Sequence, residues 1–233
     1  MSTFKQVMWI FISCVLLLTV SCSSGLDLNN PRADEYDVQI IGDSIFDLSG
    51  DIQQDLKALS GKTYKDRSRS GAQIDGIVNQ YHSAINNTPG IQTIIADGGG
   101  NDILLGNADC DTDPLTQGCL DVIDYVADKM EGLLNDFYVD GVDNCVWLGY
   151  YNMTLDQEEK NEAIVEAYSL YPAVFDDAQM NQPGSGGGAY PIDPRDDIVA
   201  SDVKSDGIHP TASGSNILAD LIYSKMEAEG MYR

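Results

Sequence analysis

Short apolar runs alternate along this chain with longer stretches in which apolar residues recur every three or four positions. The short runs have the length of buried strands, and the longer stretches have the period of helices that pack along one face. Strands are expected at residues 38–41, 62–65, 91–96, 144–150 and 198–203. Helices are expected at residues 52–59, 74–85, 122–137, 154–180 and 211–229.

This alternation predicts one α/β domain over residues 36–233, a three-layer α/β/α sandwich around a mainly parallel sheet of about five strands. The first helix is expected to end at Gly61, and Thr211 is expected to cap the last one. The glycine-rich stretch from Gln182 to Ala189 is expected to be a flexible loop near the functional site, with the following Tyr190 as a candidate for substrate contact.

The first 22 residues are expected to be a signal peptide rather than part of the fold. Lys5 is the only charged residue ahead of an apolar stretch that runs from Val7 to Val20. This stretch is shorter than the roughly 20 residues that a membrane span needs. The chain is therefore expected to be exported, and residues 23–35 are interpreted as a polar tether.

Residues 18–22 also resemble a bacterial lipoprotein processing site, in which Cys22 becomes the lipidated first residue. Ordinary cleavage nearby is the alternative. We expect either a periplasmic or outer-membrane-anchored lipoprotein or a secreted protein. This lipid would be its only attachment to a membrane.

Acidic side chains dominate the charge of the chain: 37 Asp and Glu residues against 13 Lys and Arg residues give a net charge of −24. Such a surface repels nucleic acids and anionic lipid headgroups, so neither is an expected partner. The simplest interpretation is a solvated face of an exported protein. We expect a monomer.

The stretch Gly42-Asp43-Ser44 comes directly after the first buried strand. Ligands of open α/β sheets bind at the carboxyl ends of the strands, so Ser44 would have its hydroxyl at the mouth of a crevice. That position suits a nucleophile, and it equally suits a serine that caps the following helix. These three residues alone leave both interpretations open.

Any histidine-dependent chemistry has to use His82 or His209, the two histidines of the chain. His82 lies among solvated positions of a predicted helix and is interpreted as a surface residue. Asp206 precedes His209 by three residues across Gly207, so a turn can bring its carboxylate back to the imidazole. The second ring nitrogen is then free to accept a proton. A capped turn ahead of the last helix is the alternative.

Two further turns carry donors of the kind that acyl transfer requires. Gly71 follows a polar stretch, and Asn101 follows Gly99 and Gly100 after a buried strand. A glycine lets its N–H approach an oxygen that becomes negative, and an asparagine side chain offers an NH2 group. Each turn alone is common, whereas all four features in this order form a specific pattern.

Over roughly residues 36–230 this pattern resembles the SGNH hydrolase family, also called GDSL esterases. The resemblance implies a flavodoxin-like fold and an ester hydrolase with Ser44 as the nucleophile. His209 would be the general base and acid, and Asp206 would orient it. Ile45 stands where leucine is usual after the serine, which is a mild departure.

The resemblance also implies an oxyanion hole, which would consist of the N–H groups of Ser44 and Gly71 and the side chain of Asn101. No cofactor is implied. The substrate would be a small-molecule or carbohydrate ester, with short acyl esters and O-acetyl groups both open. An O-acyltransferase acting on a surface polysaccharide is the alternative, followed by a carbohydrate-binding module without turnover.

Cys110 and Cys119 bracket a polar loop, and because an exported chain meets oxidising conditions, we expect them to form a disulfide. Cys145 lies in an apolar run without a nearby histidine, so it is interpreted as a buried, inert thiol rather than a nucleophile.

No metal site is expected. Asp109, Asp111 and Asp113 alternate as calcium ligands sometimes do, but Pro114 stands where the glycine of such a loop is needed. The loop is therefore interpreted as solvated. Two histidines and an acidic surface form no ligand cluster of convincing spacing for a metalloenzyme.

Overall fold

The computed structural model describes residues 37–48, 50–106 and 108–231. The expected signal peptide at residues 1–22, with its Cys22, and the expected tether at residues 23–35 lie outside this part of the chain. Across the described residues, no helix combines the length and apolar character that crossing a membrane requires.

Five strands form one parallel sheet in the order β2-β1-β3-β4-β5. They are β1 (Val38–Ile41), β2 (Lys65–Asp66), β3 (Thr93–Ala96), β4 (Asn144–Leu148) and β5 (Gly188–Ile192). This is the flavodoxin-like order, in which the strand sequence reverses between β1 and β3. The carboxyl ends of β1 and β3 therefore border the crevice where such sheets bind ligands.

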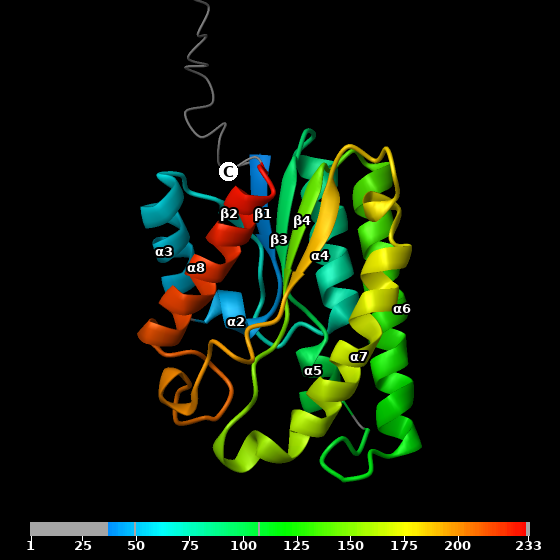
Figure 1. Ribbon diagram of the computed structural model, residues 1–233, viewed down its shortest axis with the longest axis vertical. Helices are drawn as coiled ribbons and strands as arrows, with labels where there is room; N and C mark the ends of the chain where they lie inside the picture. Colours follow the sequence, from blue (N-terminus) through cyan, green and yellow to red (C-terminus); the bar gives the residue numbers. More distant parts are fainter. Residues whose placement is uncertain (1–36, 49, 107, 232–233) are drawn as a thin grey trace, which may run out of the picture. The chain divides into compact units, whose positions relative to one another are not determined.

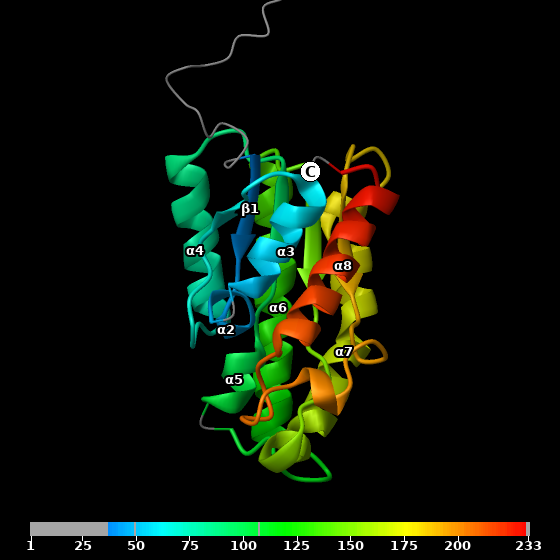
Figure 2. The ribbon, with the colours of Figure 1, turned by 90° about the vertical axis from the view of Figure 1, so that its left-hand side faces the viewer.

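Helices cover both faces of the sheet, which confirms the three-layer architecture (Figure 1). On one face α3 (Asp51–Ser60) and α8 (Ala212–Ala228) pack side by side (Figure 2). The other face carries α4 (Ile74–Asn87), α6 (Gln117–Val139) and α7 (Asn161–Asp177). The short α2 (Ser44–Asp47) and α5 (Gly100–Leu104) follow β1 and β3 at the carboxyl ends of the strands.

Strand residues alternate between the two cores because successive side chains of a strand point to opposite faces. In β3, Ile94 packs into the core under α4 and α6, whereas Ile95 packs into the core under α3 and α8. In β4, Trp147 and Val146 are divided in the same way. All four side chains are fully buried. Because both faces of the sheet are covered, every residue of a central strand is buried, and the strand sequences are therefore continuous apolar runs.

At the carboxyl-terminal side one strand was missed and one expected strand was wrong. Residues 182–187 of the glycine-rich stretch lack regular secondary structure, as expected of a loop, but residues 188–192 form β5, which pairs with β4 from Asn144↔Gly188 to Leu148↔Ile192. Residues 198–203 form the 3-10 turn η3 (Ala200–Asp202) and one isolated bridge, Val203↔Pro210, instead of a strand. Pairing with a complete neighbouring strand outweighed the poor strand propensity of glycine and proline.

The expected helix over residues 154–180 is divided into three pieces: the 3-10 helix η1 (Leu155–Lys160), then α7, then the 3-10 helix η2 (Gln179–Asn181). The helix ends read from the sequence are confirmed. Gly61 ends α3 in the left-handed conformation, with φ of 73°. Thr211 caps α8 by accepting a hydrogen bond from the N–H of Gly214.

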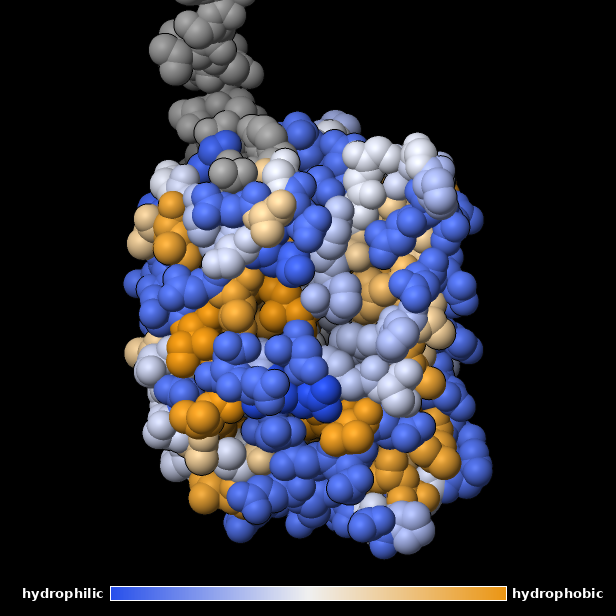
Figure 3. Space-filling view, in the orientation of Figure 1, coloured by the Kyte–Doolittle hydropathy of each residue, from blue (hydrophilic) through white to orange (hydrophobic). Residues whose placement is uncertain are grey.

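Cys110 and Cys119 form a disulfide that closes the loop ahead of α6. Cys145 is a free and fully buried thiol on β4, and burial raises its pKa. Hydrophilic residues cover most of the face shown in Figure 3, in keeping with the net charge of −24.

The core under α6 offers a direct test of the fold. Phe137 is fully buried and packs edge-on against Tyr81 of α4, with ring centroids 4.5 Å apart. Phe137→Ala should lower the free energy of unfolding by about 3–5 kcal/mol, because it removes buried apolar surface and leaves a cavity. Urea unfolding measures this change. Tyr138→Ala, at an exposed neighbour on the same helix, should stay within about 0.5 kcal/mol. Equal effects of the two variants would contradict this packing.

Candidate active site

The turn after β1 presents Ser44 as the first residue of α2. Asp43 is the residue that caps this helix, since its Oδ1 accepts a hydrogen bond of 3.0 Å from the N–H of Ile45. The capping role that the sequence left open for Ser44 is therefore taken by its neighbour. Ser44 is largely buried and lines a small pocket together with Asn101 and Ile208.

Neighbouring segments hold the backbone of this turn from two sides. The side-chain amide of Gln80 accepts from the N–H of Gly42 at 2.7 Å and donates to its carbonyl at 2.9 Å. A Cβ at position 42 would overlap the carboxyl group of Asp97, so only glycine fits there. The N–H of Arg69 donates to the same carbonyl of Gly42, which brings the loop of Gly71 onto the turn.

Asp206 and His209 form a pair within one turn. Oδ1 of Asp206 accepts from the N–H groups of Ile208 and His209, each at 2.9 Å, and its Oδ2 lies 2.9 Å from Nδ1 of His209. Burial alone would raise the pKa of Asp206, but these donors lower it to about 2. Asp206 is thus a carboxylate over the whole physiological range, which favours the tautomer of His209 with the proton on Nδ1.

The other imidazole nitrogen of His209, Nε2, is buried and has no hydrogen-bond partner among the described residues. The imidazole is close enough to the serine turn that its positive charge, when present, lowers the pKa of Asp43. Tyr151 holds the loop in place, since its hydroxyl donates to the carbonyl of Ile208. His82 lies elsewhere, on α4, where it is half exposed and pairs with Asp136.

Asn101, the second residue of α5, connects three segments of the site. Its Nδ2 donates to Oδ2 of Asp43 at 3.2 Å and to the carbonyl of Ala72 at 3.0 Å. The side chain therefore joins the turns after β1 and β3 to the loop that contains Gly71. Gly71 itself is exposed and has φ of 76°, a conformation that favours glycine.

Sequence reasoning missed a buried acid at this site. Asp97, directly after β3, accepts from the N–H of Asp43 at 2.7 Å through Oδ1, while its buried Oδ2 has no partner among residues 37–48, 50–106 and 108–231. Burial, followed by the nearby charge of Asp43, raises the pKa of Asp97 well above its ordinary value. A carboxyl group placed between an apolar run and a glycine run was the only sign of it in the sequence.

Tyr150, after β4, was also missed. Its hydroxyl donates to Oδ2 of Asp43 at 2.6 Å. Burial raises the pKa of Asp43, whereas the donors Ile45 N–H and Tyr150 O–H oppose this. Within the residues that the structure describes, Asp43 accepts from Ile45, Asn101 and Tyr150, but Asp97 accepts from one donor. We therefore assign the charge to Asp43 and the proton to Asp97, because a buried charge needs hydrogen-bond donors.

The remaining expectations concern other surfaces. Tyr190 lies in β5 opposite Val146, within the sheet rather than at the carboxyl edge that bears Ser44. Within residues 37–231, apart from positions 49 and 107, no cluster of three or more His, Cys, Asp or Glu side chains could hold a metal ion.

No family model and no curated protein matches this chain. Solved structures do. A mutant acetyl esterase with an acetate ion has a TM-score of 0.64 at 14% identity, over 82% of this chain and 96% of that chain. A carbohydrate esterase family 3 protein from Talaromyces cellulolyticus has a TM-score of 0.62 at 15% identity, over 82% and 96%. A GDSL-like lipase from Bacteroides thetaiotaomicron has a TM-score of 0.59 at 16% identity, over 84% of this chain and 89% of that chain.

The chain has the SGNH hydrolase fold. At these identities the likeness concerns the fold alone. Within that fold, the described residues Ser44 and Asn101 occupy the turns after β1 and β3, and the Asp206–His209 pair lies in the loop before α8.

The assignment of the proton to Asp97 predicts how stability depends on pH. A carboxyl group whose pKa is raised in the folded state stabilises the fold while it is protonated. This contribution is fully present below about pH 4 and is lost as the pH rises toward the pKa of the folded state. Asp97→Asn keeps an oxygen for the N–H of Asp43 but cannot ionise. Between pH 4 and 8, wild type should therefore lose stability relative to Asp97→Asn, by up to roughly 1 kcal/mol per pH unit.

Urea unfolding at several pH values measures this difference. Asp124→Asn, at an exposed position of α6, should keep the pH dependence of wild type. Parallel stability profiles for wild type and Asp97→Asn would show that Asp97 is not the protonated group.

Proposed function

We propose that the protein is a serine esterase that hydrolyses carboxylic esters through an acyl-enzyme, with short acyl esters or O-acetylated carbohydrates as substrates. The observation that carries this proposal is the state of His209, whose Nδ1 faces the Asp206 carboxylate while its buried Nε2 has no hydrogen-bond partner in the described part of the chain. Such a nitrogen carries a lone pair that can take a proton from a hydroxyl group. Ser44 supplies the hydroxyl, because it shares a pocket with Ile208, the neighbour of His209.

The proposed reaction uses these groups in two halves. Nε2 of His209 takes the hydroxyl proton of Ser44 as Oγ attacks the ester carbonyl carbon. Collapse of the tetrahedral intermediate breaks the bond to the alcohol oxygen, which receives the proton from His209. Water, deprotonated by His209, then attacks the acyl-enzyme, and the acid leaves as Ser44 regains its proton. Asp206 stabilises the imidazolium in both halves.

The oxyanion would be bound by the N–H groups of Ser44 and Gly71 and by the side chain of Asn101. Both hydrogens of the Asn101 amide have acceptors in the free protein, namely Asp43 and Ala72. Oxyanion binding by Asn101 therefore requires that one of them be shared. Asp43 can share its donor, since its Oδ2 also accepts the shorter bond from Tyr150.

We also propose that the protein is exported from the cytoplasm. The apolar residues 7–20 and Cys22 support a signal peptide of the lipoprotein type, which would bring the enzyme to the periplasm or the outer membrane.

Ser44→Ala should remove the nucleophile and lower kcat for p-nitrophenyl acetate and acetylated xylan at least about a thousandfold, with little effect on stability. Release of p-nitrophenol and of acetate measures the two reactions. Ser213→Ala, an exposed serine on α8, is the matched control and should retain wild-type rates. Hydrolysis by Ser44→Ala at the wild-type rate would exclude Ser44 as the nucleophile.

Asn101→Ala tests the oxyanion hole. Loss of one donor should lower kcat about a hundred- to a thousandfold. The same variant also loses two internal hydrogen bonds, so thermal unfolding has to be measured beside the kinetics. Gln73→Ala, which removes a 3.4 Å hydrogen bond to the carbonyl of Asn101 and leaves the Asn101 side chain in place, is the control. Full activity of a folded Asn101→Ala protein would rule out its role.

A further inference from the structure

An apolar cavity of about 40 Å³ lies beside the serine pocket, between α6, α7 and the turn after β3. None of the described residues that line it is charged. Its aliphatic lining on the two helices comes from Ile123, Val126, Met130, Ile164, Ala167 and Val174. One water needs roughly 10–15 Å³, but it also needs polar partners, so this space favours an apolar occupant.

The cavity and the serine pocket are separated by only a few side chains. Tyr150 and Met153 line both spaces. Helix α5 lies between them as well, with Asn101 and Leu104 on the side of Ser44. Its Gly100 and Ile103 face the cavity. An apolar chain attached to the serine would pass beside the ring of Tyr150, whose hydroxyl is held by Asp43, and would displace Met153, a flexible side chain.

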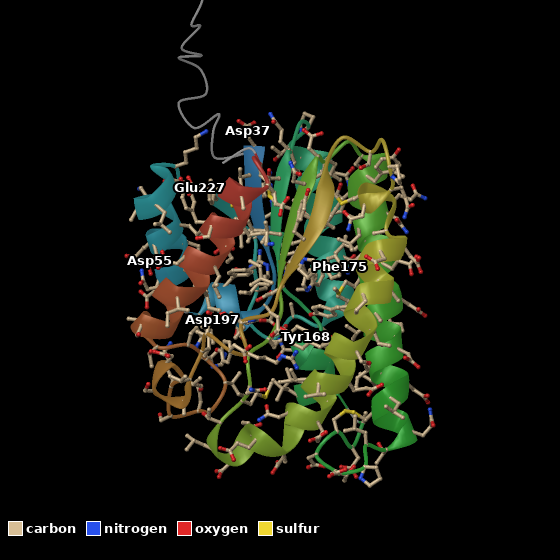
Figure 4. All side chains as sticks on the ribbon, viewed as in Figure 1. Asp37, Asp55, Tyr168, Phe175, Asp197 and Glu227 are labelled. Carbon is tan, nitrogen blue, oxygen red and sulfur yellow. A yellow bond between two sulfur atoms is a disulfide. The ribbon has the colours of Figure 1, made fainter. Side chains whose placement is uncertain are left out.

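Two tyrosines of the cavity, Tyr150 and Tyr168, have hydroxyl groups that are already hydrogen-bonded. The hydroxyl of Tyr150 donates to Asp43, and that of Tyr168 donates to the carbonyl of Tyr150 at 2.9 Å. Figure 4 shows Tyr168 near the end of the sheet where the strands finish. Transfer of an alkyl chain from water into this lining would therefore be favourable and would not break the hydrogen bonds of these two hydroxyl groups.

Two glycines bring the oxyanion turn against the cavity. A Cβ on Gly99 would lie 2.5 Å from a methyl carbon of Val126, and one on Gly100 would lie 2.6 Å from the ring of Tyr150. Because Gly99 and Gly100 have no side chains, the backbone next to Asn101 forms one wall of the cavity. The cavity therefore begins beside the position where the ester carbonyl would be bound.

We propose that this cavity binds the alkyl tail of the acyl group, with Met153 moving aside, and that it makes the enzyme selective for short aliphatic acyl chains longer than acetyl. The inference rests on the proposed esterase function. The acyl side is favoured over the alcohol side because His209 has to reach the leaving alcohol oxygen. No residue of the described loop around Asp206 and His209 lines the cavity.

The size of the cavity sets the expected chain length. It holds about three groups of the size of a water, so acyl chains of about four to six carbons should be preferred. Each buried methylene should raise kcat/KM about fourfold, until the cavity is full.

Two isomeric esters, ethyl hexanoate and hexyl acetate, test the proposal because one carries its six-carbon chain as the acyl group and the other as the alcohol. Wild type should hydrolyse ethyl hexanoate with the higher kcat/KM. Ala167→Leu, which fills the cavity from α7, should lower the ratio of the two kcat/KM values roughly tenfold, as two methylenes lose their place. Ala173→Leu, at an exposed position of the same helix, is the matched control and should keep the wild-type ratio.

A binding measurement keeps the test independent of turnover. Sodium hexanoate should bind wild type and Ser44→Ala more tightly than sodium acetate, by about fourfold per buried methylene, in calorimetric titrations. Ala167→Leu should reduce the difference between the two anions roughly tenfold, and Ala173→Leu should retain it.

Preference for hexyl acetate would assign the cavity to the alcohol side and overturn the proposal. An unchanged ratio in Ala167→Leu, or equal binding of hexanoate and acetate, would overturn it as well. If wild type hydrolyses p-nitrophenyl acetate but shows no cavity effect, only this inference fails. If it hydrolyses no ester, the proposed function fails, and the hexanoate titrations alone decide whether the cavity binds alkyl chains.

Discussion

The geometry of the site depends on the burial of two carboxyl groups, Asp43 after β1 and Asp97 after β3. Asp97 accepts the N–H of Asp43, and the Asp43 carboxylate in turn accepts from Ile45, Asn101 and Tyr150. A buried carboxylate is costly unless donors surround it. The need to satisfy Asp43 therefore draws together the ends of β1, β3 and β4 and holds Ser44 at their junction.

This network explains why two positions near the site are occupied by glycine. Glycine at position 42 leaves the space that the Asp97 carboxyl group fills, and glycine at position 100 leaves the space for the ring of Tyr150. The same ring separates the serine pocket from the apolar cavity. A single set of close contacts thus shapes both the position of the serine hydroxyl and the space behind it.

Much of the fold could be predicted from the chain. The strands at 38–41 and 93–96 were recognisable because a sheet covered on both faces buries every residue of a short run. The last strand was not, because glycine and proline in β5 are characteristic of loops when only neighbouring residues are considered. Only its pairing with β4 explains that strand. Likewise, a serine and an aspartate in succession gave no means of deciding that Asp43 rather than Ser44 caps α2.

By itself the sequence determined the features that arise within a few residues: the order of strands and helices, the turns that carry Ser44 and Asn101, and the pair of Asp206 and His209, which are three positions apart. The tertiary structure alone decided the contacts of Asp43 with Asp97 and Tyr150, which lie 54 and 107 positions away along the chain. It also created the cavity between α6 and α7. The physical reason is that such contacts depend on how separate elements pack. A repeating pattern of apolar residues indicates which face of an element is buried, but it does not indicate which other element packs against that face.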